Sequence, residues 1–310
     1  MLTFNRIDHF GQVVPDLDRQ VGLLEGLFGF QTTERWEDAD ARGALLAVPG
    51  RSATNWEVLA PAGDGSPWQA FLDGPTGPGV HHVALEVPAV EETREALRKL
   101  GIAFEEREGS RIDAAIEPQK RGEGLVFRFA TAGAAAACHR SDASVTRAAS
   151  AHGDAPHLGI VAVDHLCHAY RDRDELARWY ERVLGMREVW RTPDGEHEDL
   201  ADCVLEVPGG QLAWEIIQPV GDESFIRRFL DSRGPAPHHV TFQVADWDAA
   251  VAACEHHGIP MFDENQGETG GARWRDAFVH PKHTGGMLVQ LFWEERPGVW
   301  VRSDKVPSNA

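Results

Sequence analysis

Paired histidines open two similar strand-like segments of this chain, "GVHHVALEV" at residues 79–87 and "PHHVTFQV" at residues 237–244. A polar imidazole fills a hydrophobic core poorly, whereas it serves well as a metal ligand or a proton carrier. Because successive side chains of a strand point to opposite faces, His239 and His238 are expected on opposite sides of the sheet. One histidine of the pair then belongs to a site, and its neighbour serves packing or lies at the surface.

The same alternation selects side chains on other strand-like segments of the C-terminal half that share a face with His239. The candidate metal ligands are His165, Glu215, His239 and Gln290. Two imidazoles, a carboxylate and an amide oxygen suit one first-row divalent ion, namely Zn, Fe(II), Mn, Co or Ni. Thiolates, which are typical of structural zinc, are absent from these positions. The set therefore favours a catalytic site with open coordination positions.

Internal repetition supports this convergence. The dipeptide Asp-His occurs at 8–9 and 164–165, Trp-Glu at 56–57 and 214–215, and His-His at 81–82 and 238–239. The three pairs recur at a nearly constant offset, which indicates that one half of the chain duplicates the other.

A finer repeat defines the elements that must position these residues. Amphipathic segments that end at glycine predict four helices, at residues 21–30, 91–102, 175–186 and 247–259. Each follows one strand-like run and precedes several more, so each quarter reads as a βαβββ module and the fold class is α+β. The predicted domains are 1–132 and 158–296, joined by a linker at 133–157 and followed by a tail at 297–310.

Composition narrows the class of protein. The 310 residues are 42% hydrophobic and carry a formal net charge of −19, which argues against a nucleic-acid partner. No apolar run approaches the length needed to span a membrane. The four scattered cysteines favour reduced thiols and a cytoplasmic location. We expect a small-molecule substrate and a monomer or homodimer.

These features together resemble the vicinal oxygen chelate superfamily, which includes glyoxalase I, methylmalonyl-CoA epimerase, extradiol dioxygenases and bleomycin-resistance proteins. The Asp-His strand, the His-His strand and "GETGGARWRDAFVHPKHTGGMLVQL" at 267–291 carry the resemblance. It implies two tandem glyoxalase-like domains, each a cupped mixed sheet, with His165, Glu215, His239 and Gln290 on the four ligand positions. The epimerases have Gln and Glu where this chain has Glu215 and Gln290, and a Gln side chain accepts no proton.

The resemblance implies an enzyme that acts on a substrate with vicinal oxygens, most simply an epimerase or isomerase that uses a metal-stabilised enolate or enediolate. An extradiol-type Fe(II) ring-cleavage dioxygenase is the alternative, and a metal-free small-molecule binding protein is the third reading. The sequence does not identify the general base, although Asp202, Glu206 and His168 lie near the presumed site strands.

The N-terminal half repeats part of the ligand set as His9, Glu57 and His82. Its last strand-like segment, at residues 124–131, offers only Phe127 or Arg128 where a fourth ligand would stand. We therefore expect a degenerate site that serves as scaffold or substrate wall, while three ligands leave a second metal site open.

Overall fold

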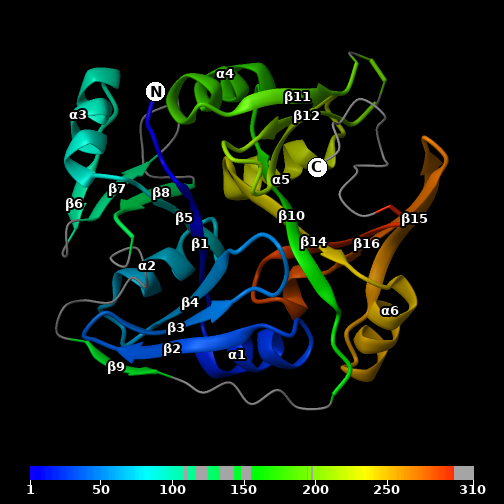
Figure 1. The fold of residues 1–310 in the computed structure, drawn as a ribbon, viewed down its shortest axis with the longest axis horizontal. Coiled ribbons are helices and arrows are strands. Elements are labelled where there is room, and N and C mark those ends of the chain that lie inside the picture. The colour runs from blue at the N-terminus through cyan, green and yellow to red at the C-terminus, as the bar shows by residue number, and fades with distance from the viewer. Residues whose placement is uncertain are drawn as a thin grey trace.

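The computed structural model contains four βαβββ modules in tandem, as the sequence predicts (Figure 1). The structure describes residues 1–107, 111–115, 125–132, 143–147, 155–193, 195–196 and 198–296. Module 1 comprises β1 (Arg6–Val13), α1 (Leu17–Gly26), β2 (Gln31–Glu37), β3 (Ala41–Ala47) and β4 (Asn55–Pro61). Module 2 comprises β5 (Gly79–Glu86), α3 (Val90–Leu100), β6 (Glu105–Arg107), β7 (Arg111–Ala115) and β8 (Val126–Ala130). Module 3 comprises β10 (Ile160–Ala169), α4 (Arg173–Leu184), β11 (Arg187–Arg191), β12 (Leu200–Glu206) and β13 (Ala213–Pro219). Module 4 comprises β14 (Ala236–Val244), α6 (Trp247–His256), β15 (Met261–Thr269), β16 (Ala272–Val279), the short 3-10 helix η1 (Pro281–His283) and β17 (Leu288–Glu294).

Each half of the chain builds one mixed sheet from two modules. The strand order is β6-β7-β8-β5-β1-β4-β3-β2-β9 in the N-terminal half and β11-β12-β13-β10-β14-β17-β16-β15 in the C-terminal half. The first strands of the two modules pair antiparallel, β1 with β5 and β10 with β14. Each first strand also pairs in parallel with the last strand of its own module. This pairing is the same in both halves and brings the first and last strands of both modules together at the centre of each sheet.

The helices follow from the apolar stripes and caps in the sequence. In α4, the Asp172 side chain accepts a hydrogen bond from the backbone N–H of Glu175 at 2.9 Å, a standard N-cap. The helix ends where Gly185 adopts a left-handed φ of 68°, as its terminal glycine predicts. The predicted stripe is buried: Leu176, Trp179, Tyr180, Val183 and Leu184.

Three elements were not predicted from the sequence. Helices α2 (Pro67–Asp73) and α5 (Phe225–Arg233) each connect the two modules of one half, and strand β9 (Ser144–Arg147) pairs with the edge strand β2. Strand β9 lies within the expected linker, and most of the remainder of 133–157 and the tail lie outside the described residues, as does Cys138. The domain boundaries stay predictions. Among the described residues, no helix is long and apolar enough to cross a membrane.

The two halves share one hydrophobic core. Phe28 and Phe30 pack edge-to-face against Phe242, with ring centroids 5.6 and 5.8 Å apart, and Phe127 stacks on Trp214 at 5.7 Å. Module 1 therefore packs against module 4, and module 2 against module 3.

Two reciprocal polar clamps also join the halves. The Gln211 side chain accepts a hydrogen bond from the backbone N–H of Ile7 at 2.7 Å and donates one to its carbonyl at 2.8 Å. In the opposite direction, the Ser52 hydroxyl accepts from the N–H of Val163 at 2.6 Å and lies 3.3 Å from its carbonyl oxygen. Each half thereby holds the first strand of the other, two residues before its Asp-His histidine.

Candidate metal centre

Three of the predicted ligands meet on the inner face of the C-terminal sheet. The Nε2 atoms of His165 and His239 lie 3.3 Å apart, and the Glu215 Oε2 atom lies 3.6 and 3.3 Å from them. Ligands that surround one first-row ion at about 2.1 Å in tetrahedral geometry stand about 3.4 Å from one another. The three atoms therefore have the spacing that such an ion requires, and the group can hold a metal ion.

Strand register explains why these atoms meet. Cys167 on the central strand β10 is the pairing partner of both Glu215 on β13 and His239 on β14. Paired residues point to the same side of a sheet, so the carboxylate and the imidazole converge next to His165, which is two residues from Cys167.

Gln290 joins the same face through Thr241. Thr241 pairs with His165 on one side and with Gln290 on the other. Its hydroxyl lies 2.8 Å from the His165 Nε2 atom and donates a hydrogen bond to the Gln290 Oε1 atom at 2.8 Å. The structure therefore brings all four predicted residues to one place.

Each imidazole is held through its other ring nitrogen. The His165 Nδ1 atom lies 2.7 Å from the Asp164 carboxylate, and the His239 Nδ1 atom lies 3.0 Å from the Nδ1 atom of His238. Burial, with the adjacent His239, lowers the pKa of His238 to about 3, so its neutral ring can accept the Nδ1 proton of His239. Both histidines then present an Nε2 lone pair to the centre, as metal-ligating histidines do.

The placement of His238 differs from the expectation that it faces away from His239. Strand β14 advances two residues, from His239 to Pro237, while β10 advances one, from Cys167 to His168. This β-bulge inserts His238 beside His239 and breaks the alternation on which the prediction rested. Phe229 of α5 packs edge-to-face on the His238 ring at 4.9 Å, which keeps it against its neighbour.

Of the three base candidates, only Asp202 lies beside the ligands, and one of its carboxylate oxygens, Oδ1, is buried. Asp202 pairs with Ile217 on β13, and Ile217 stands two residues after Glu215 on that strand. Asp202 therefore points to the same face of the sheet as Glu215. Burial, reinforced by the Glu215 carboxylate, raises the pKa of Asp202 to about 8. Burial also opposes ionisation of Glu215, but the neighbouring His239 and His165 side chains hold the Glu215 pKa below its usual range.

The other two candidates have different partners. Glu206 accepts a hydrogen bond from Arg187 at 2.6 Å near the surface. His168 lies on the opposite face, with its Nδ1 atom 2.8 Å from the Tyr180 hydroxyl, and burial lowers its pKa to about 3. Neither residue is placed to exchange a proton with a substrate at the centre.

The N-terminal half reproduces the three-residue group in a closed form. The Nε2 atoms of His9 and His82 lie 3.3 Å apart, and the Glu57 Oε2 atom lies 3.7 and 3.2 Å from them. All three side chains are fully buried, whereas 13% of the Glu215 side chain is exposed. Phe127 packs into the shared core, and Arg128 turns to this group with only 5% exposure.

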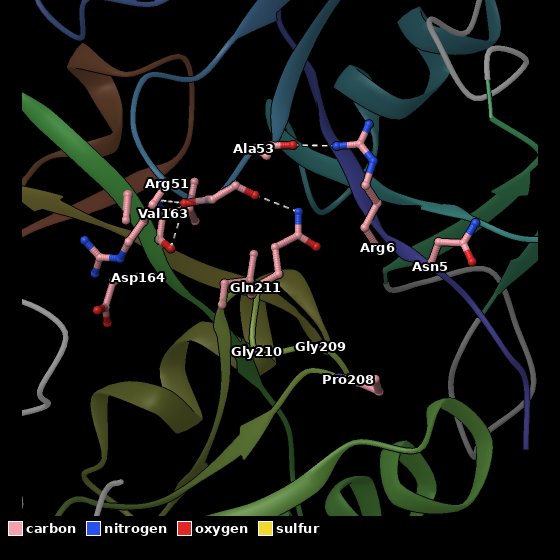
Figure 2. A pocket seen from close by; sticks show the side chains of 13 residues that line it. Asn5, Arg6, Arg51, Ala53, Val163, Asp164, Pro208, Gly209, Gly210 and Gln211 are labelled. Carbon is pink, nitrogen blue, oxygen red and sulfur yellow. Dashed lines mark hydrogen bonds between the residues drawn. The ribbon is translucent and has the colours of Figure 1, made fainter. Parts of the chain in front are cut away.

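Two cavities of about 520 Å³ each lie between the halves. Figure 2 shows the first, where Gln211 reaches across to residues of the N-terminal half and Asp164 forms part of the wall. The second is lined by the "HPKH" residues 280–283 together with Arg19 and Arg233. Arg273 lies outside this lining and forms an ion pair with Glu295 at 3.1 Å.

The chain belongs to the Glyoxalase/Bleomycin resistance protein/Dioxygenase superfamily, which it matches over residues 8–116 and 164–278. This confirms the resemblance and the tandem glyoxalase-like architecture.

Relatives with this fold differ in chemistry. The chain is 29% identical over 130 residues to human mitochondrial methylmalonyl-CoA epimerase, covering 42% of this chain and 72% of that protein. It is 28% identical over 134 residues to ethylmalonyl-CoA/methylmalonyl-CoA epimerase of Cereibacter sphaeroides, covering 43% and 97%. A triple mutant of 4-hydroxymandelate synthase from Streptomyces coelicolor superposes with a TM-score of 0.75 at 14% identity, covering 99% of this chain and 97% of that chain. The last similarity concerns the fold alone.

Proposed function

We propose that the protein is a divalent-metal-dependent epimerase or isomerase that acts on a small substrate with vicinal oxygens. The observation that carries the proposal is the mutual spacing of the His165, Glu215 and His239 ligand atoms, at 3.3 to 3.6 Å, with Gln290 on the same face. The similarity to epimerases at 28–29% identity supports proton transfer as the chemistry.

In this proposal the four side chains hold one first-row divalent ion, with Glu215 as the anionic ligand. The bound ion would supply Lewis-acid polarisation of the substrate oxygens and acidify the adjacent C–H bond. Asp164 and His238 fix the ring orientations of His165 and His239. The donor set fits such an ion because both histidines turn Nε2 inward and one carboxylate compensates charge.

We assign Asp202 as the base. One of its carboxylate oxygens, Oδ1, is buried and has no hydrogen-bond partner among the described residues. In the ionised form this oxygen takes the proton from the substrate carbon, the carboxyl group exchanges that proton with solvent, and a proton then returns to the other face of that carbon or to its neighbour. Gln290 cannot take this role because its amide does not accept a proton.

A ring-cleaving dioxygenase is the second candidate. His165, His239 and Glu215 also form a set of two histidines and one carboxylate, which binds Fe(II) in many oxygenases. The two candidates differ in metal, in oxygen consumption and in the fate of the substrate C–H bond.

The first experiment measures metal content of anaerobically purified protein by mass spectrometry. We expect about one divalent ion per chain, which Glu215→Ala loses and the matched variant Glu57→Ala retains. Absence of metal from the native protein would contradict both enzyme proposals and favour a binding protein.

The second experiment follows the reaction. Exchange of solvent deuterium into C2 of methylmalonyl-CoA or into an α-hydroxyketone, measured by NMR, is expected for the native protein. Asp202→Asn should lose this exchange while it keeps its metal. Stoichiometric iron with oxygen uptake on catechols, and no deuterium exchange, would support the dioxygenase instead.

A further inference from the structure

We infer that Arg128 is a built-in cation that stands in place of a metal ion in the N-terminal half, and that replacing it opens a second metal site at His9, Glu57 and His82. The inference rests on the proposed metal site of the C-terminal half.

Strand register places Arg128 at the position of Gln290. Arg128 on β8 pairs with Ala84 on β5, as Gln290 on β17 pairs with Thr241 on β14. Ala84 and Thr241 each stand two residues after the site histidine of their strand. The fourth ligand position of the N-terminal half therefore carries a guanidinium in place of an amide oxygen.

The guanidinium reaches the point where the ligands converge. The Arg128 Nη1 atom lies 3.4 Å from the His82 Nε2 atom. The Glu57 Oε2 atom lies 3.2 Å from the same His82 Nε2 atom. A fixed positive charge at this distance compensates the buried Glu57 and repels a divalent cation. Arginine suits the role because it stays protonated when buried.

A second residue holds the guanidinium in place. Asp113 on β7 accepts two hydrogen bonds from Arg128, at 2.8 and 2.7 Å, in the fork geometry that fixes an arginine side chain. Asp113 pairs with Arg128 across the ladder, whereas Phe278 pairs with Gln290 in the C-terminal half. The two halves therefore differ at a matched pair of neighbouring positions, Arg128 with Asp113 and Gln290 with Phe278.

This pair can be exchanged between the halves. The N-terminal variant combines Arg128→Gln with Asp113→Phe, so that the Asp113 carboxylate is not left without its arginine partner. The reciprocal variant combines Gln290→Arg with Phe278→Asp. Arg128→Lys, which keeps a positive charge, is the control. Each full-length protein is equilibrated with Co²⁺, and bound metal is counted by mass spectrometry and by the visible absorption of the ion, with circular dichroism to confirm folding.

The expected counts are one ion per chain for the native protein and for Arg128→Lys, two for the N-terminal variant and none for the reciprocal variant. Adding Glu57→Ala to the N-terminal variant should return the count to one. The inference is overturned if the folded N-terminal variant binds no additional ion, or if the native chain already binds a second ion that Glu57→Ala removes. A native chain without metal contradicts the proposed function instead, and the gain of one ion by the N-terminal variant still decides the inference.

Discussion

The carboxylate behind His165 offers a quantitative test of the metal centre. Asp164 lies 2.7 Å from the His165 Nδ1 atom, and both residues are buried, at 9% and 3% exposure, so solvent screens their interaction little. Asp164→Asn keeps an acceptor oxygen of the same shape and removes only its charge. Hydrogen bonds to charged groups contribute about 1.5–3 kcal/mol and neutral ones about 0.5–1.5 kcal/mol.

The difference between a charged and a neutral hydrogen bond to His165, about 1–1.5 kcal/mol, corresponds to roughly a tenfold weaker metal affinity. Substituting a residue that hydrogen-bonds to a metal ligand typically weakens metal binding 10- to 100-fold, and this value is at the lower end. Competition with a chromophoric chelator at fixed pH measures it. Asp8→Asn is the matched control, because Asp8 contacts the His9 Nδ1 atom at 2.9 Å in the half expected to hold no metal. Equal effects of the two substitutions, or no effect of Asp164→Asn, would refute the reasoning.

Three further outcomes are expected. Because burial lowers the pKa of His168 to about 3 from its ordinary 6.5, its contribution to stability is present above pH 6.5 and is lost as the pH falls toward 3. His168→Gln should therefore reduce the loss of unfolding free energy between pH 7.5 and 5 by about 2 kcal/mol in urea titrations, and an unchanged pH dependence would contradict this. A Cβ at Gly11 would lie 1.8 Å from the His82 ring, so Gly11→Ala should lower the melting temperature, whereas Gly22→Ala, with open space around it in helix α1, should leave it unchanged or raise it. When the free metal ion is held at about 100 times its Kd, removing it with a chelator should lower the free energy of unfolding by about 2.7 kcal/mol and the melting temperature by several degrees. Glu215→Ala should abolish this shift, and absence of the shift in the native protein argues against a bound ion.

The sequence was sufficient for the repeat and for the ligand face. Glu215 and Gln290 lie on uninterrupted stretches of the ladder, where simple alternation decides the face, and His165 lies on an uninterrupted pairing with β13 although its pairing with β14 is irregular between Val163 and His165. His238 could not be placed this way because a bulge adds one residue to its strand, and alternation assumes none. The recurrence of His-His at the same place in both halves was a signal that the pair acts together, since packing alone rarely selects two imidazoles.

The two missed helices illustrate a different limit. They are short, and each ends at a glycine that is followed by proline, Gly74 and Gly234, whereas the glycines of the four predicted helices are followed by Phe, Ile or Met. Both nevertheless begin at a serine whose hydroxyl caps the backbone, Ser66 and Ser224, at matching places in the two halves. Comparing the halves with each other would have revealed them. Asp113, in contrast, gave no signal, because its partnership with Arg128 depends on a cross-strand register that the intervening residues do not encode in any periodic way.

The clamps between the halves indicate what the N-terminal copy, which we propose holds no metal, contributes. Ser52 holds Val163 through its backbone N–H at 2.6 Å, and His165 follows two residues later on the same strand. The Arg51 side chain hydrogen-bonds to Gln243, which lies two residues beyond Thr241 on the strand that carries His239. Both strands that supply histidines to the candidate centre are thus held by one loop of the N-terminal half. Since ligand atoms must keep their spacing to within a few tenths of an ångström, the N-terminal half acts on the centre through the position of its strands, and it can do so only while its own buried Glu57 is neutralised. A fixed arginine meets that need at every metal concentration, which a second bound ion would not.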